Sequence, residues 1–275
     1  MSHEDENDDG LPWQAIATSK SPYLNNEMLS VDGVTVRIVG ANVDEVTDPE
    51  DRQRKVAKIA LALEEADLHR IRDAAAAASR VLMVGFNRRF APQVQRIKSL
   101  LAGAVGPKAF VMTVNAGSIP ASHWTQDREV GGGRLVGEGC HFIDLLRFLS
   151  GSPIVQHQVA AMDGPTRDSA TVSLRFADGS LGTLLYLANG SKTFPKERLE
   201  VFAAGRVLQL DNFRRLAGFG WPGFSRMNLW RQDKGQQACA RAFVSAIEQG
   251  GPAPIPLEEL LEVSRVSIAV EDALR

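Results

Sequence analysis

The segment from residue 131 to residue 151, GGGRLVGEGCHFIDLLRFLSG, carries the residue types best suited to chemistry. Its first three glycines permit close approach of the backbone to a ligand before a helix begins. His141, Leu145 and Phe148 follow at helical spacing, so the imidazole shares a face with apolar side chains and is expected to point inward. An inward-facing imidazole of this kind is a candidate acid–base group.

Glu138 lies three residues before His141, on roughly the same face of the expected helix. A carboxylate beside a buried imidazole can tune it for proton transfer near neutral pH. A core histidine that is merely satisfied by a carboxylate has the same pattern. Both interpretations, a catalytic pair and a structural pair, are open on the residues alone.

A second cluster, GFNRRF at residues 85–90, ends the apolar run of residues 80–86, which is predicted to be a buried, parallel strand. Open α/β sheets place their ligands at the carboxyl ends of such strands, which makes Asn87 and Arg88 candidate ligand contacts. Arg88 and Arg89 together can clamp a phosphate or carboxylate. The alternative is a solvated surface pair.

Two further segments supply polar side chains for a pocket. His123 and Trp124 lie in an expected loop and can stack on, and hydrogen-bond to, a sugar ring. Lys196, in FPKER at residues 194–198, can add one cation, although a charged strand edge is the alternative explanation.

The elements that must position these residues follow from periodicity. Helices are expected at residues 49–63, 64–79, 93–101, 137–149, 234–249 and 257–274. Strands are expected around residues 34–38, 80–86, 110–114, 170–176, 184–188, 199–202 and 207–210. Asp178-Gly179 and Gly205 predict hairpin turns, so residues 106–212 are predicted to form a mostly antiparallel sheet with at least one embedded helix.

Charge and cysteine usage exclude several classes of protein. The 31 basic and 33 acidic residues nearly cancel, so no nucleic-acid partner is expected. Cys140 and Cys239 lie outside any CxxC motif, which indicates a cytoplasmic, reducing address and no structural zinc. No apolar run reaches the ~18 residues of a membrane span, so no membrane contact is expected. Residues 1–12 are acidic and are predicted to be a disordered tail.

One glycine motif is rejected. Residues 218–223, GFGWPG, match GxGxxG letter by letter, but that motif binds a dinucleotide only when it follows a strand and opens a helix. Arginines precede it, and Pro222 with Gly223 makes a poor helix interior. No other segment carries a dinucleotide fingerprint, a Walker A loop or a paired-ligand metal motif, so no metal site is expected from these motifs.

Several segments, in order, strongly resemble the Gfo/Idh/MocA oxidoreductases. They are EEADLHRIRDAAAAASRVLMVGFNRRFAP, GGGRLVGEGCHFIDLLRFLSG, FADGSLGTLLYLANG, FPKERLEVF and LDNFRRLAGFGW. The resemblance covers residues 64–275 and is closest to the branch of sugar, sugar-nucleotide and inositol dehydrogenase-like proteins.

The resemblance implies an amino-terminal Rossmann domain that binds NAD or NADP, and a carboxyl-terminal domain whose open sheet shapes the substrate site and joins subunits into homo-oligomers. It implies hydride transfer at a secondary alcohol of a sugar or cyclitol. His141 matches the family's catalytic histidine, which exchanges the hydroxyl proton. The family often has an aspartate four residues earlier, where this chain has Gly137, with Glu138 one place later.

The first 63 residues depart from the family. VAKIALAL, residues 56–63, falls where relatives carry VEKPLAL, so Lys58 is a candidate for the lysine that polarises the substrate oxygen. The dinucleotide fingerprint that should precede it is absent from this sequence. Residues 15–63 instead faintly resemble Maf-like nucleotide pyrophosphatases, and Asp44 with Glu45 could bind a divalent ion.

The fold class expected is therefore α/β (α+β): an incomplete Rossmann-like or Maf-like segment over residues 13–105, followed by an open, mostly antiparallel sheet with helices on one face over residues 106–275. Three functions stay open. They are an NAD(P)-dependent oxidoreductase, a catalytically silent homologue that binds a sugar-like ligand or a partner, and a nucleotide pyrophosphatase remnant.

Overall fold

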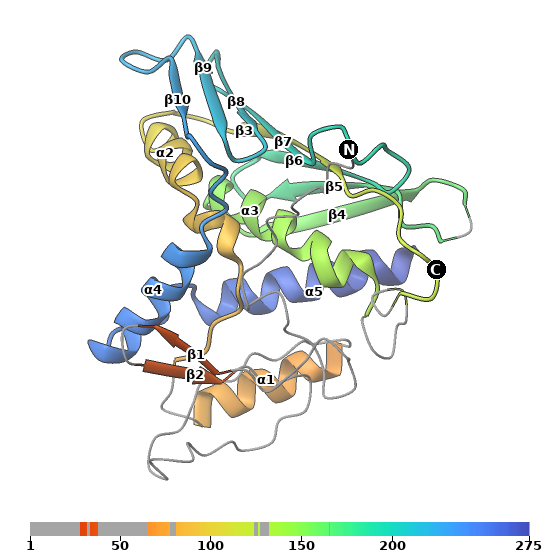
Figure 1. The fold of residues 1–275 in the computed structure, drawn as a ribbon, viewed down its shortest axis with the longest axis vertical. Coiled ribbons are helices and arrows are strands. Elements are labelled where there is room, and N and C mark those ends of the chain that lie inside the picture. Colours follow the sequence, from red (N-terminus) through yellow and green to blue (C-terminus); the bar gives the residue numbers. More distant parts are fainter. Residues whose placement is uncertain are drawn as a thin grey trace, which may run out of the picture.

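The structure, a computed structural model, describes residues 28–31, 34–37, 65–77, 81–123, 126, 132–164 and 166–274. An open eight-stranded sheet in the order β10-β9-β8-β7-β3-β6-β5-β4 occupies the upper part of the view in Figure 1. The expected fold class, a mixed α/β chain with an open, mostly antiparallel sheet, is confirmed.

The strands of this sheet are β3 (Lys108–Asn115), β4 (Ile154–Ala161), β5 (Ala170–Phe176), β6 (Leu181–Leu187), β7 (Glu197–Ala203), β8 (Arg206–Asp211), β9 (Arg215–Phe219) and β10 (Arg226–Asn228). The β3–β6 pair is parallel, and the other neighbours in the sheet are antiparallel. A separate antiparallel pair joins β1 (Met28–Val31) to β2 (Val34–Arg37), where the sequence predicts a strand.

The helices are α1 (Glu65–Ala77), α2 (Pro92–Leu101), α3 (Cys140–Ser150), α4 (Gln236–Glu248) and α5 (Leu257–Ala273), with a 3-10 turn η2 (Asn87–Phe90) and a π-helical turn η4 (Leu135–Gly139). Helices α3 and α5 lie on one side of the sheet (Figure 1). Phe110, Met112 and Val114 of β3 point into this side and are buried, as their alternation predicts. The main core therefore lies between the sheet and α3.

The two expected hairpins form because each depends on a local turn. Gly179 (φ +85°) links β5 to β6, and Gly205 (φ +73°) follows Ala204 (φ +48°) between β7 and β8. The consecutive positive φ values of Ala204 and Gly205 match the twist of adjacent antiparallel strands, and glycine adopts a positive φ at little steric cost.

The prediction of a buried parallel strand at residues 80–86 is wrong for residues 81–86, which belong to no strand. The amides of Phe86 and Asn87 instead bond to the carbonyls of Val84 and Gly85, two residues back, and the chain tightens into η2. Met83 and Phe86 are buried in the main core without joining a sheet. The apolar run thus predicted correctly that these residues are buried. It did not show that a neighbouring strand is available to pair with them.

Some expectations lie outside the described residues. These are the acidic tail, the helix at residues 49–63 and nearly all of the Maf-like segment.

Candidate active site

His141 lies in the first turn of α3 and is partly buried. The ring of Phe86 meets it edge-on, with the two centroids 5.7 Å apart. Its Nδ1 atom is buried and has no hydrogen-bond partner among the described residues. Burial, helped by the positive charge of Arg88, lowers the pKa of His141 to about 3. The imidazole is therefore neutral near pH 7, and its pKa is not tuned to neutral pH as the pairing with Glu138 suggested from the sequence.

Glu138 lies in the π-helical turn η4 that leads directly into α3. Its carboxylate forms an ion pair with the Lys196 ammonium at 2.6 Å and accepts a hydrogen bond from the Tyr186 hydroxyl. Burial alone would raise the pKa of Glu138, but the charge and hydrogen bond of Lys196 outweigh it and lower the pKa to about 2. Glu138 is thus a charged anchor for Lys196 and Tyr186.

Arg88 is buried and binds the protein's own carboxylate. Its Nη2 atom lies 2.6 Å from Oε1 of Glu197 at the start of β7, and its guanidinium carbon lies 4.5 Å from the Phe142 ring centroid. Arg89 forms the same kind of pair with Asp144. The expectation of a solvated surface pair is wrong, because both arginines are less than a tenth exposed. The clamp geometry exists, and it is occupied by internal carboxylates.

Lys234, in the loop before α4, is a site residue that the sequence patterns did not reveal. Its ammonium lies 3.3 Å from Oε2 of Glu197, and its carbonyl accepts a hydrogen bond of 2.8 Å from the Asn87 side chain. Burial lowers the pKa of Lys234. Asn87, Arg88, Glu197 and Lys234 thus form one connected cluster beside His141.

Three residues of this region, Glu197, Arg134 and Lys234, were not predicted from the sequence because their partners are distant in the chain. Glu197 and Arg134 lie within segments that the sequence singled out, but their partners are far away in the chain. Lys234 lies in no motif, and it reaches the cluster because η2 and the start of α4 pack together. A turn signal does exist around it, since the Gly235 amide bonds to the Asp233 side chain at 2.8 Å.

Other predicted site residues are placed elsewhere or not described. The His123 carbonyl accepts a hydrogen bond from the amide of Gln126, in a turn that follows Pro120. Trp124, Lys58, Asp44 and Glu45 lie outside the described residues.

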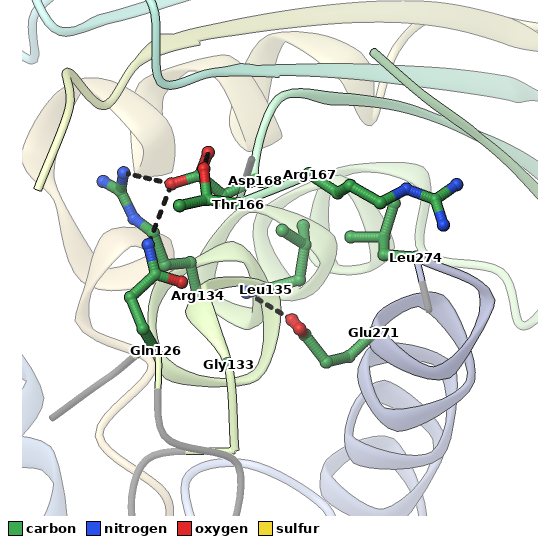
Figure 2. Close-up of a pocket in the computed structure, with 9 residues that line it drawn as sticks. All are labelled: Gln126, Gly133, Arg134, Leu135, Thr166, Arg167, Asp168, Glu271 and Leu274. Atoms are coloured by element: carbon green, nitrogen blue, oxygen red, sulfur yellow. Dashed lines mark hydrogen bonds and ion pairs between the residues drawn. The ribbon is translucent and has the colours of Figure 1, made fainter. Parts of the chain in front are cut away.

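A small polar pocket adjoins the site (Figure 2). Its volume is about 150 Å³, and it is lined by Gln126, Gly133, Arg134, Leu135, Thr166, Arg167, Asp168, Glu271 and Leu274. The Arg134 guanidinium lies 3.2 Å from the Asp168 carboxylate, and Glu271 accepts a hydrogen bond of 2.9 Å from the Leu135 amide. Glu271 therefore satisfies a backbone donor at the start of η4.

Arg134 connects this pocket to the His141 site. Its guanidinium lies 3.8 Å from the Glu138 carboxylate and its carbon 5.3 Å from the Tyr186 ring centroid. A chain of alternating charges thus runs from Lys196 through Glu138 and Arg134 to Asp168. Internal ion pairs of this kind fix side chains at a ligand site before a ligand arrives.

The described residues show no fingerprint of a dinucleotide-binding turn. Residues 218–223 span the end of β9 and the turn to β10, so this GxGxxG match opens no helix, as expected. Within the part of the chain that the structure describes, no glycine-rich turn leads directly from a parallel strand into a helix; Gly132 and Gly133 precede η4, but they do not follow β3 directly. Within the same part, no group of three or more His, Cys, Asp or Glu side chains is arranged to hold a metal ion, and no helix is long and apolar enough to cross a membrane.

Comparison with known proteins defines the class. Residues 94–205 match the family model of the GFO/IDH/MocA C-terminal domain. This match confirms, over that domain, the resemblance to the Gfo/Idh/MocA oxidoreductases.

Solved structures agree on the fold. Levoglucosan dehydrogenase, in complex with NADH and levoglucosan, matches over 80% of this chain and 71% of its own, with 20% identity and a TM-score of 0.67. UDP-N-acetylglucosamine 3-dehydrogenase from Acidithiobacillus ferrooxidans matches over 80% and 72%, with 19% identity and a TM-score of 0.66. An oxidoreductase domain protein from Kribbella flavida matches over 79% and 71%, with 23% identity and a TM-score of 0.69.

Proposed function

We propose that this chain binds a sugar, sugar nucleotide or inositol beside His141 and takes part in the NAD(P)-dependent oxidation or reduction of one of its secondary alcohols. The observation that carries the proposal is the neutral imidazole of His141, whose buried Nδ1 atom has no partner among the described residues. A neutral imidazole nitrogen accepts a hydrogen bond from a hydroxyl group, which is the contact that an alcohol substrate requires.

The surrounding groups suit a polyol. Oδ1 of Asn87 is also buried without a hydrogen bond within the described part of the chain, and Oε2 of Glu197 faces the Lys234 ammonium at 3.3 Å. Both are acceptors, and neighbouring hydroxyls of a sugar or cyclitol are donors that match them. Lys196 is 41% exposed while it holds Glu138, so its ammonium is still accessible to a ligand. We assign Asn87, Arg88 and Lys196 to this site, with Arg88 acting through Glu197.

The comparisons support the reaction class. Two structures that share this fold are named as dehydrogenases of levoglucosan and of UDP-N-acetylglucosamine, and a third is an aldose-aldose oxidoreductase from Caulobacter crescentus. Oxidation of an alcohol removes a proton from oxygen and a hydride from carbon, and NAD or NADP supplies the hydride acceptor when bound. Here the unprotonated nitrogen of His141 accepts the hydroxyl hydrogen bond and is the group placed to receive the proton that leaves.

A second candidate function is a catalytically silent homologue that binds a sugar-like ligand. The observation in its favour is that the chain's one GxGxxG match lies at a hairpin, so the described residues build no dinucleotide cradle. The two candidates share the polyol site and differ only in the use of a cofactor.

The test is a titration of the purified chain with NADH, NADPH, myo-inositol, levoglucosan and UDP-N-acetylglucosamine, followed by nicotinamide fluorescence and thermal shift. We expect polyol binding that His141→Ala weakens by about ten-fold, the value of one buried hydrogen bond, while His157→Ala, on the exposed face of β4, leaves it unchanged. Micromolar cofactor binding with turnover supports the oxidoreductase. Polyol binding without any cofactor binding supports the silent homologue, and the absence of both contradicts the proposal.

A further inference from the structure

The backbone around Lys234 is held by contacts from three directions. The Asp233 amide donates to the carbonyl of Phe213 at 3.2 Å, and the Asn87 side chain donates to the Lys234 carbonyl at 2.8 Å. Gly235 (φ +84°) then brings the chain so close to η2 that a Cβ atom would lie 2.4 Å from the Ala91 amide nitrogen. These contacts fix the position of the Lys234 backbone, as the support of a ligand-binding side chain requires.

Three consecutive residues, 86 to 88, connect Lys234 to His141. Phe86 packs against the His141 ring, Asn87 bonds to the Lys234 backbone, and Arg88 pairs with the carboxylate that also faces the Lys234 ammonium. One short segment therefore contacts both the His141 ring and the Lys234 backbone, and Lys234 faces Glu197.

The ion pair with Glu197 does not use all the hydrogen-bond donors of the Lys234 ammonium. Oε1 of Glu197 already accepts two hydrogen bonds from Arg88, at 2.6 and 3.2 Å, so the carboxylate charge is largely matched without Lys234. Oε2 lies 3.3 Å from the Lys234 ammonium, so the pair engages one of the ammonium's donors. An ammonium has three donors, so Lys234 retains donors for a ligand oxygen.

We propose that Lys234 is a ligand-binding residue of the His141 site, and that its ammonium donates a hydrogen bond to the polyol oxygen that His141 also holds. This inference rests on the proposed function.

The electrostatics agree with this geometry. Burial lowers the pKa of His141, and the charges of Arg88 and Lys234 lower it further, whereas Glu138 and Glu197 raise it. Burial also lowers the pKa of Lys234; Arg88 and Lys196 add to this effect, and Glu197 opposes it. Lys234 can therefore lose its proton at a lower pH than an ordinary lysine, and ligand affinity is expected to fall as pH rises through that pKa.

The experiment measures the affinity of the full chain for myo-inositol, levoglucosan and UDP-N-acetylglucosamine by calorimetric titration from about pH 6 to pH 10, a range that brackets lysine titration. Lys234→Gln removes the donor and is expected to weaken binding about ten-fold or more. Lys234→Arg keeps a permanent charge and is expected to bind within about three-fold of the parent at neutral pH, without the alkaline loss. Lys192→Gln, in an exposed loop, is the matched control.

The outcomes separate the two proposals. If the parent chain binds none of the probes, the proposed function fails and the role of Lys234 fails with it. If the parent binds and Lys234→Gln binds equally well, or if Lys234→Arg shows the same alkaline loss as the parent, only the assignment of Lys234 is overturned. A cooperative thermal transition in each variant shows that a loss of affinity is not a loss of folding. If Lys234→Gln does not fold, the alkaline profile of Lys234→Arg decides alone.

Discussion

Individual side chains at this site are held by charges of opposite sign in nearly every case. Glu138 holds Lys196, and Glu197 holds Arg88 and Lys234, so the site is ordered before any ligand arrives. His141 is the exception, because its buried nitrogen faces no described partner. The sequence predicted the inward face of His141 from helical spacing alone. It did not predict that Glu138 would bind Lys196, because that contact joins residues 58 positions apart.

The pair formed by Glu138 and Lys196 makes stability depend on pH. The pKa of Glu138 is lowered from 4.5 to about 2 in the folded chain, so the pair contributes fully above the unfolded pKa and is lost as pH falls from about 4.5 to 2. We expect a contribution of about 1–2 kcal/mol, discounted because Lys196 is partly exposed. Urea unfolding of the parent and of Glu138→Gln, at neutral pH and near pH 3, measures it. The difference in unfolding free energy between the parent and Glu138→Gln should be smaller near pH 3 than at neutral pH. An equal difference at both pH values would contradict the stabilising role of the pair.

Among the elements, the two hairpins set by local sequence form as expected, whereas the strand expected at residues 80–86 is not found. The turns at Gly179 and Gly205 depend on two or three residues, and both hairpins form as predicted. The strand expected at residues 80–86 needed a neighbouring strand, and residues 81–86 have none. Lys234 has the same kind of explanation, since its role comes from the contact between the start of α4 and η2. Hydrophobic periodicity indicates which face of a helix or strand is buried. It does not indicate which element packs against that face.

The contact between the start of α4 and η2 predicts unequal effects at two glycines. Gly235 (φ +84°) and Gly250 (φ +61°) bracket α4, but a Cβ atom would meet the η2 backbone at Gly235 and open space at Gly250. Gly250→Ala is expected to cost about 1 kcal/mol from the positive φ alone. Gly235→Ala adds a backbone clash and should cost roughly 3 kcal/mol, with weaker ligand binding because Lys234 is displaced. Thermal and urea unfolding compare the two variants, and equal losses would show that the close approach is unimportant.

At the scale of the whole molecule, the sheet has one face packed on helices and one face with exposed apolar side chains. Strand register places Leu181, Ala109, Phe202, Val207 and Phe219 opposite one another in a row across five strands. Phe202 and Phe219 are 43% and 56% exposed. Cross-strand neighbours share one face, so this row is a continuous apolar stripe. Such a stripe is a candidate surface for self-association, which the sequence resemblance also predicted.

A charge placed in the middle of this stripe should therefore separate the subunits without unfolding the chain. We expect the parent to have about twice the chain mass in solution, the commonest closed assembly, and Phe202→Glu to have the mass of one chain. Light scattering after size exclusion measures both masses. Ile247→Glu, at an exposed apolar position of α4, is the control and should behave as the parent does. Because His141 lies on the helical side of the sheet, Phe202→Glu should still bind the polyol. A parent chain that is monomeric at every concentration, or a Phe202→Glu variant that still associates, would show that this face does not join subunits.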